Sequence, residues 1–278
     1  MWFFFAALLL IWAAGLADDI WTLSPILRLV AQTGGAIFLW SGGWRLPWLS
    51  GPVNLAASAL LIVLFINSFN FLDGSDGLCA GATGIIAAAY LVLPGLTLSS
   101  LGTTVASSLL GVSVGFLVFN LPVADIHMGD SGSTILGFGI AFLALDFYRA
   151  NPLSEHRLGL SFPLLMAALP LLDGIMAVFR RLHAGRALSQ GDRFHFYDLL
   201  LELNWPPRKV ALTTYGLTAG MCIIAWLVLK CDFTGAFLLG VASLSTLVVA
   251  AVRLGALRAG ERLPPLFARS NQDVRRTL

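Results

Sequence analysis

The sequence turns polar at INSFNFLDGSDGLCAG, residues 66–81, between two long apolar runs. The run before it is NLAASALLIVLF, residues 54–65, and the run after it is ATGIIAAAYLVLPGL, residues 82–96. Apolar runs on this scale are typical of helices that cross a bilayer. Two amides and two acids recur here at every third position, Asn67, Asn70, Asp73 and Asp76. The stretch therefore predicts an all-α membrane protein with polar chemistry at a helix end.

The composition of the whole chain also indicates a membrane protein. Of its 278 residues, 58% are hydrophobic and 12% are charged, whereas soluble domains carry about 25% charged residues. We expect one polytopic transmembrane domain over residues 1–278, its active site on cytoplasmic loops, and no nucleic acid as a partner. The apolar runs predict about nine spanning helices, at residues 2–17, 25–41, 52–69, 78–98, 102–119, 131–148, 160–179, 209–229 and 234–252.

Lysine and arginine are unevenly distributed over the connections between these helices. Positive residues favour the cytoplasmic side of a membrane. Most of them fall after the seventh predicted helix and in the tail, at Arg180, Arg181, Arg186, Arg193, Arg208, Lys209, Arg253, Arg258, Arg262, Arg269, Arg275 and Arg276. Two predicted helices separate these groups, so both lie on one side. We therefore expect a multi-pass protein of the inner (plasma) membrane with a cytoplasmic C-terminus.

Most of the acidic residues also fall on this side of the membrane when the predicted helices between them are counted. Counting helices places on the cytoplasmic face Asp18, Asp19, Asp73, Asp76, Asp125, Asp130, Asp173, Asp192 and Asp198. Carboxylates at a membrane boundary are costly unless they are paired, solvated or bound to a metal. Mg²⁺ typically uses one or two carboxylates together with substrate phosphates. The pattern predicts a site for Mg²⁺ and phosphate, with Mn²⁺ as the alternative ion.

Three further stretches carry candidate residues. In HMGDSGSTILGFG, residues 127–139, Asp130 lies in a turn that opens a helix, where it either holds a metal or caps the helix. GLADDIWTLSP, residues 15–25, places Asp18 and Asp19 at a helix exit, either in a site or in a solvated turn. RRLHAGRALSQGDRFHFYDLL, residues 180–200, is either a positive anchor or a substrate loop, since arginine suits bidentate contact with phosphate.

Four blocks in this order resemble one family, the polyprenyl-phosphate N-acetylhexosamine-1-phosphate transferases (glycosyltransferase family 4). GLADDIWTLSPILRLVAQ is similar to the family's Asp-Asp block, and NSFNFLDGSDGLCAG to its Asn-x-x-Asn-x-x-Asp-Gly-x-Asp-Gly block. FNLPVADIHMGDSGSTILG resembles its Met-Gly-Asp-x-Gly-Ser block, and PLLDGIMAVFRRLHAGRALSQGDRFH its last cytoplasmic loop. The resemblance covers roughly residues 10–200.

The resemblance implies transfer of a sugar-1-phosphate from a UDP-N-acetyl sugar to undecaprenyl or another polyprenyl phosphate, with release of UMP. Mg²⁺ is then required, and Asp130 matches its ligand. His195 matches the first histidine of the family's His-x-His-His loop. Together with the residue pattern, this gives catalytic candidates at Asp18, Asp19, Asp73 and Asp76. The substrate-binding candidates are Asn67, Asn70, Arg186, Asp192, Arg193 and His195.

Two departures from the family pattern shape the expectation. Tyr197 and Asp198 stand where the loop's second and third histidines are expected. This favours the enzymes that initiate surface polysaccharides, such as O-antigen, common antigen and teichoic acid, over the phospho-MurNAc-pentapeptide transferase of peptidoglycan synthesis. The chain also begins too late for the first two helices that are usual in the family.

Two other functions stay open on the sequence alone. An ion-coupled transporter would use the acids as cation sites, but such sites typically lie near the bilayer midplane, whereas these acids gather on one face. An inactive, truncated homologue acting as a partner subunit is the other alternative. For the transferase itself, a homodimer is the candidate assembly, in addition to the lipid bilayer and the two substrates as partners.

Overall fold

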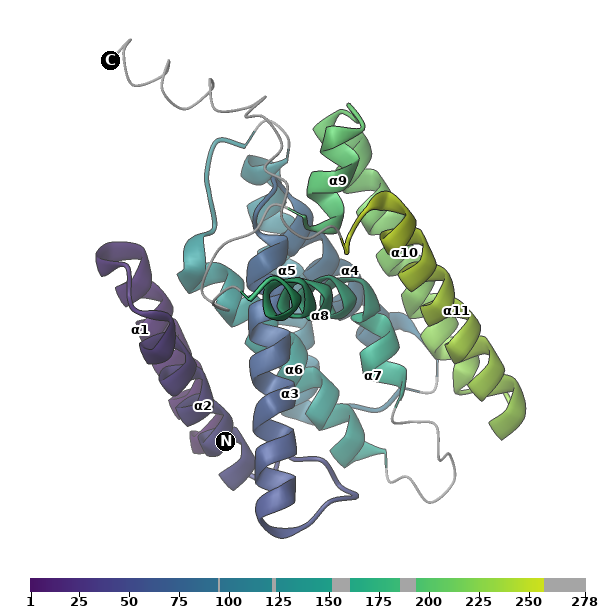
Figure 1. Ribbon diagram of the computed structural model, residues 1–278. Coiled ribbons are helices and arrows are strands. Elements are labelled where there is room, and N and C mark those ends of the chain that lie inside the picture. Colours follow the sequence, from purple (N-terminus) through teal and green to yellow (C-terminus); the bar gives the residue numbers. More distant parts are fainter. Residues whose placement is uncertain (95, 122–123, 152–160, 186–193, 258–278) are drawn as a thin grey trace.

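The computed structural model describes residues 1–94, 96–121, 124–151, 161–185 and 194–257 (Figure 1). Within these residues, six helices are long and apolar enough to cross a membrane, α1, α3, α5, α6, α10 and α11. The prediction of an all-α, multi-pass membrane protein is confirmed at this level. In chain order the helices are α1 (Trp2–Trp21), α2 (Pro25–Ser41), α3 (Gly51–Leu72), α4 (Leu78–Val92), α5 (Ser100–Asn120), α6 (Gly129–Ala150), α7 (Ser161–Met166), α8 (Ala168–His183), α9 (Phe196–Glu202), α10 (Pro207–Val228) and α11 (Phe233–Leu254).

The predicted count of nine spanning helices is not confirmed. Helices α2 and α4, with 17 and 15 residues, are shorter than the six. The prediction of one helix over residues 160–179 is wrong, because the chain breaks between α7 and α8. Proline lacks an amide hydrogen, and its ring clashes with the carbonyl group four residues earlier. Pro170 therefore disfavours a helix continued through Met166, and Ala167 between the two helices has non-helical angles, φ −96° and ψ 16°.

Helix α6 forms the centre of the bundle. It packs against α1, α3, α4 and α5, and every residue from Leu136 to Tyr148 is buried. A helix that is apolar on all sides is typically buried on all sides. The one charge in this run, Asp146, accepts hydrogen bonds from the Trp44 indole at 3.0 Å and from the Ser99 amide and hydroxyl at 2.8 and 2.7 Å. These bonds offset the cost of burying the carboxylate and fix the far end of α6.

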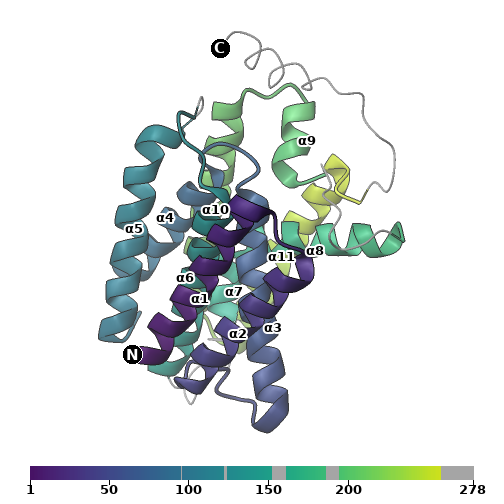
Figure 2. The ribbon, with the colours of Figure 1, turned by 90° about the vertical axis from the view of Figure 1, so that its left-hand side faces the viewer.

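The long helices pack closely around α6. Helices α1 and α2 lie against one side of α6 and α3, and α10 and α11 lie on the other side of the bundle (Figures 1 and 2). A Cβ atom on Gly137 of α6 would lie 2.8 Å from the Cα of Ile66 and 2.9 Å from the carbonyl oxygen of Phe65, both in α3. Small residues allow membrane helices to approach in this way. Gly137 therefore sets the spacing between the helices that carry Asp73 and Asp130.

Helix α8 lies across the bundle rather than along it, end-on in Figure 1 and side-on in Figure 2. It packs against α3. The short helix α9, which packs against α10, falls in the region predicted as a loop. Its first turn is closed by the Asp198 carboxylate, which accepts from the backbone N–H of His195 at 3.2 Å. Together α8 and α9 bring the side chains of Asp173 and His195 to the end of α3.

The close approach of α3 and α6 predicts an asymmetric effect of two identical substitutions. Gly137→Ala places a methyl group against the backbone of α3, so it should cost about 1–3 kcal/mol and lower Tm in detergent by several degrees. Gly111→Ala on α5 is the matched control, because nothing lies within 4 Å of a Cβ there and alanine favours helix. Equal Tm values for the two variants, measured by thermal unfolding, would contradict this packing.

Candidate functional site

Four helix ends converge at one end of the bundle. The C-terminal ends of α1 and α3 meet the N-terminal ends of α2 and α6 there. They bring together Asp18 and Asp19 from α1, Arg28 from α2, Asp73 at the end of α3 and Asp130 from α6. We call these five residues the charged cluster. Four of the acids that helix parity placed on one face, Asp18, Asp19, Asp73 and Asp130, therefore lie near one another.

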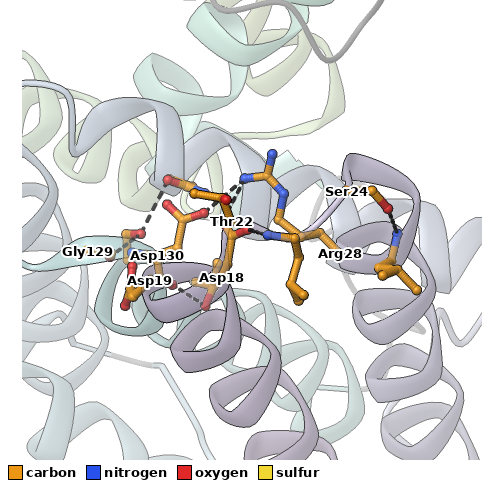
Figure 3. Close-up of polar contacts among 12 residues, drawn as sticks. Asp18, Asp19, Thr22, Ser24, Arg28, Gly129 and Asp130 are labelled. Atoms are coloured by element: carbon orange, nitrogen blue, oxygen red, sulfur yellow. Dashed lines mark hydrogen bonds and ion pairs between the residues drawn. The ribbon is translucent and has the colours of Figure 1, made fainter.

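Arg28 bridges two of the acids (Figure 3). Its Nη1 donates to Asp18 Oδ2 at 3.1 Å and to Asp130 Oδ2 at 2.9 Å. The side chain of Asp18 is 11% exposed and that of Asp130 is 25% exposed. Partly buried ion pairs are screened by salt less than exposed pairs. A single guanidinium therefore links α1, α2 and α6.

Asp19 holds the start of α6. Its carboxylate accepts from the backbone N–H groups of Asp130 at 2.8 Å and Ser131 at 3.0 Å. The first N–H groups of a helix have no partner inside the helix, so a carboxylate there is stabilising. Gly129 has φ +69°, and a Cβ on it would lie 2.8 Å from Asp19 Oδ1, so glycine is required at this turn. Asp19 is the cap of α6, while the Asp130 side chain binds Arg28 instead.

Asp73 lies where negative charge is most concentrated. Burial, followed by the nearby charges of Asp130, Asp19 and Asp76, raises the pKa of the Asp73 carboxyl to about 7. Both causes disfavour the ionised form. Asp76 itself turns toward the connection before α6, where it accepts from the backbone N–H of Ala124 at 3.2 Å. Asp73 is therefore a group that can gain or lose a proton near neutral pH.

The two predicted amides of α3 lie at different depths. Asn70 Oδ1 accepts from the hydroxyl of Ser133, at 3.4 Å, one turn into α6. Asn67 lies a turn further from the end of α3 and donates to Gln32 Oε1 of α2 at 2.7 Å and to the carbonyl oxygen of Val63 at 2.8 Å. Asn70 therefore borders the charged cluster, whereas Asn67 holds α2 against α3.

A buried histidine–aspartate pair lies beside the end of α3. His195 Nδ1 is 2.6 Å from Asp173 Oδ2, and Asp173 Oδ1 accepts from the backbone N–H of Phe196 at 2.8 Å. When the carboxyl group of Asp173 is ionised it only accepts hydrogen bonds, and in that state Nδ1 of His195 is the donor in this contact. The His195 ring stacks on Tyr197, with ring centroids 5.6 Å apart, and lies 5.4 Å from Phe71 of α3. Asp173 thus fixes the orientation of the imidazole.

The two residues that depart from the family's histidine loop have structural partners here. The Tyr197 hydroxyl donates to the carbonyl oxygen of Phe71 at 3.2 Å, and the Tyr197 ring packs against Gly74. Asp198 closes the first turn of α9. Tyr197 therefore ties α9 to the end of α3, next to Asp73, while Asp198 stabilises the start of α9 itself.

Sequence reasoning overlooked two contributors to the site and proposed three others that lie outside the described residues. The missed residues are Arg28 and the partner of His195, Asp173. A signal for Arg28 existed, since a charged residue in the first turn of an apolar helix needs a partner, and an acidic pair lies ten residues earlier. Arg186, Asp192 and Arg193 fall outside the described residues.

The charged cluster offers oxygen ligands to a divalent cation. Asp18 and Asp130 direct carboxylate oxygens at one point, now taken by Arg28 Nη1. In the described part of the chain, no group of three or more His, Cys, Asp or Glu side chains is arranged to hold a metal alone. Mg²⁺ typically needs only one or two carboxylates when substrate phosphates complete its shell. The donor set fits that mode, with Asp18 and Asp130 as the residues that could hold the ion.

The pKa of Asp73 predicts a pH-dependent stability. The folded pKa of about 7 exceeds the value of about 3.9 in an unfolded chain. The folded state therefore binds more protons between these values, and the free energy of unfolding falls as pH rises from about 4 to 7. Asp73→Asn removes the titrating carboxyl group, so the variant does not lose stability in this way. The Tm of the variant minus the Tm of the wild type should therefore be a few degrees larger at pH 8 than at pH 5. Thermal unfolding in detergent with EDTA measures this, and a pH-independent difference would contradict the assigned pKa.

Comparison with known proteins places this cluster in a family. Residues 1–148, more than half of the chain, match the family model described as glycosyl transferase family 4. The chain is 32% identical over 231 residues to the decaprenyl-phosphate N-acetylglucosaminephosphotransferase of Mycobacterium leprae, covering 72% of this chain and 58% of the relative. It is 35% identical over 214 residues to the phospho-N-acetylmuramoyl-pentapeptide-transferase of Moorella thermoacetica, covering 76% and 60%.

A third relative is more distant. The chain is 25% identical over 201 residues to the undecaprenyl-phosphate alpha-N-acetylglucosaminyl 1-phosphate transferase of Escherichia coli, covering 68% of this chain and 52% of the relative. The chain thus spans less than two thirds of the length of these curated relatives. The family match over residues 1–148 includes all five residues of the charged cluster, and it confirms the family expected from the four sequence blocks. The chain belongs to glycosyl transferase family 4.

Proposed function

We propose that this chain transfers an N-acetylhexosamine-1-phosphate from a UDP-sugar to a polyprenyl phosphate and releases UMP. The observation that carries the proposal is the charged cluster, which gathers four carboxylates and an arginine at one end of a multi-pass chain of this family. A dense group of acids at a membrane boundary suits a reaction that joins a soluble diphosphate to a lipid phosphate at the bilayer surface. The names of the relatives support a polyprenyl phosphate as the acceptor and an N-acetylglucosamine phosphate as the group transferred.

The mechanism we propose relies on positioning and charge. Phosphoryl transfer needs little covalent help from protein. A divalent cation, Mg²⁺ or Mn²⁺, would neutralise the donor diphosphate and stabilise the departing UMP. Asp18 and Asp130 hold that charge in place, and Asp19 fixes the backbone from which Asp130 projects. A phosphate with a second pKa near about 6 is largely ionised at pH 7, so the lipid phosphate attacks directly.

Asp73 is then the residue that accepts the proton of the acceptor phosphate. Its pKa of about 7 lets it take a proton from the fraction of lipid phosphate that is still singly ionised. Asp18 and Asp19 are weaker candidates for a base, because Asp18 is paired with Arg28 and Asp19 is engaged by backbone N–H groups. Their main role is to position the metal and the start of α6.

His195 is proposed to contact the donor. Its imidazole is held by Asp173 beside the end of α3, next to the segment that holds Arg186, Asp192 and Arg193 in the sequence. The departures at Tyr197 and Asp198 support a surface-polysaccharide enzyme. The similarity to the Moorella relative supports a second candidate for the donor substrate, one that carries phospho-N-acetylmuramoyl-pentapeptide.

The site is proposed to face the cytoplasm of a bacterial inner membrane. The positive connection at residues 180–209 supports this orientation, and a cytoplasmic UDP-sugar pool requires it. A reporter inserted at residue 190 should then be cytoplasmic and one at residue 154 external, whereas both on one side would contradict the orientation.

Purified chain, Mg²⁺ and undecaprenyl phosphate should be offered a panel of UDP-N-acetyl sugars, with UDP-MurNAc-pentapeptide among them. UMP release together with a lipid-linked product identifies the reaction and its donor. UMP release with the pentapeptide donor alone would favour the second candidate. Absence of UMP release with every donor, from protein that unfolds cooperatively, would count against the proposed function.

Asp130→Asn should abolish most of the activity. The swap removes a negative ligand from a hard cation that prefers carboxylate oxygen. Losing several kcal/mol of transition-state stabilisation lowers the rate about a hundredfold or more. Asp232→Asn is the matched control, because Asp232 caps the start of α11 and asparagine caps equally well. UMP release is measured over a Mg²⁺ titration, and a stable Asp130→Asn enzyme that keeps more than about a tenth of wild-type activity rules Asp130 out as ligand.

His195→Ala should impair donor use without changing the need for metal. Losing a hydrogen bond that involves a charged group costs about 1.5–3 kcal/mol, so turnover or UDP-sugar affinity should fall by about tenfold or more. His183→Ala, at the exposed end of α8, is the control. His195→Asn, whose amide can still donate to Asp173, separates a folding defect from a catalytic one. A change confined to the Mg²⁺ requirement would contradict the assigned role.

A further inference from the structure

Arg28 contacts two acids through a single nitrogen atom. One nitrogen, Nη1, donates to both Asp18 and Asp130 (Figure 3). Arginine has five N–H donors. Among the described residues, no hydrogen-bond partner is found for Nη2 and Nε of Arg28, and Figure 3 shows the second terminal nitrogen turned away from the two acids. The guanidinium therefore binds both acids through Nη1, and the N–H groups of Nη2 and Nε remain available to a ligand.

Nη1 also occupies the point at which Asp18 and Asp130 could hold a divalent cation. A guanidinium and a divalent cation repel each other over a few ångström, so the two cannot share these oxygens. The Arg28 side chain is 35% exposed and lies in the first turn of α2, which leaves it room to move. A divalent cation held by Asp18 and Asp130 would therefore displace the guanidinium of Arg28 from these two carboxylates.

The surface around Arg28 indicates what the released guanidinium meets. Its neighbours at the start of α2 are apolar and strongly exposed, with Ile26 at 73%, Leu27 at 54%, Leu29 at 52% and Val30 at 62%. In a multi-pass membrane chain, such an exposed apolar surface suits contact with lipid. Guanidinium groups bind phosphate oxygens in a bidentate manner. A phosphate carried on an isoprenoid chain matches both features, since the chain covers the apolar surface while the headgroup reaches Arg28.

We propose that Arg28 is the residue that positions the acceptor phosphate. In the free protein it holds Asp18 and Asp130 together, and when the divalent cation takes these carboxylates it turns to the phosphate of the polyprenyl phosphate. This inference rests on the proposed function and deepens it. No covalent bond forms or breaks in the exchange.

Three variants of the full chain test the exchange. Arg28→Gln removes the charge, Arg28→Lys keeps the charge but loses the planar fork, and Arg149→Gln changes an arginine at the opposite end of α6. Mn²⁺ binding is measured by electron paramagnetic resonance without substrates. Binding of undecaprenyl phosphate is measured without donor, and the KM values for lipid and for UDP-sugar are measured separately.

Arg28→Gln should bind Mn²⁺ about tenfold more tightly than wild type, because the competing charge is gone. Its affinity for undecaprenyl phosphate should fall, with KM for the lipid rising about tenfold or more and KM for the UDP-sugar changing less than about twofold. Arg28→Lys should bind Mn²⁺ like wild type and show an intermediate KM for the lipid. Arg149→Gln should match wild type in every measurement.

The opposite pattern identifies a purely structural ion pair. Weaker Mn²⁺ binding by Arg28→Gln, with a lower Tm and an unchanged KM for the lipid, would overturn the proposal, as would a rise only in the KM for the UDP-sugar. If Arg28→Gln does not fold, an unchanged lipid KM in Arg28→Lys overturns it. If the wild type releases no UMP and binds no Mn²⁺, the proposed function itself fails, whereas an active wild type with unaffected Arg28 variants defeats this inference alone.

Discussion

The contact between Asp19 and the first N–H groups of α6 is the constraint on which the rest of the site depends. Asp130 and Ser131 donate to one carboxylate 111 and 112 residues away in the chain. Because α6 is the buried centre of the bundle, fixing its first turn fixes the direction in which Asp130 projects. Arg28 can then bind Asp130 and Asp18 together, and the end of α3 can place Asp73 beside these residues. At the other end of α6, the bonds to Asp146 prevent the helix from sliding.

Part of this arrangement could be predicted from the sequence. The length and composition of the apolar runs indicate spanning helices, and counting them brings Asp18, Asp73 and Asp130 to one face. Such reasoning works because spanning helices alternate in direction. It failed at residues 160–179, where apolar composition hides a break near Pro170 that leaves α8 lying across the bundle. The hydrophobicity of a segment indicates that it is buried in lipid or protein, but it does not indicate the direction in which its helix runs.

The finer geometry of the site could not be predicted from local sequence. Asp130 and Asp19 were both candidates for several roles, and only their spatial relation shows that Asp19 caps α6 while Asp130 pairs with Arg28. The same holds for His195, whose partner Asp173 lies 22 residues earlier on a different helix. Pairings of this kind depend on how helices pack. Tyr197 and Asp198 illustrate the point. They depart from the family's histidine motif, yet Tyr197 ties α9 to α3 and Asp198 closes the first turn of α9.

The central claim is that the charged cluster acts on phosphate rather than on the anomeric carbon of the sugar. Its acids, its arginine and the raised pKa of Asp73 all suit attack at phosphorus. The most direct measurement uses UDP-N-acetylglucosamine labelled with ³²P at the β-phosphate, together with undecaprenyl phosphate and the full chain. Attack at phosphorus predicts that the label appears in the lipid product and that the released nucleotide is unlabelled UMP. Label recovered in released UDP would show cleavage of the sugar–oxygen bond and would contradict the account.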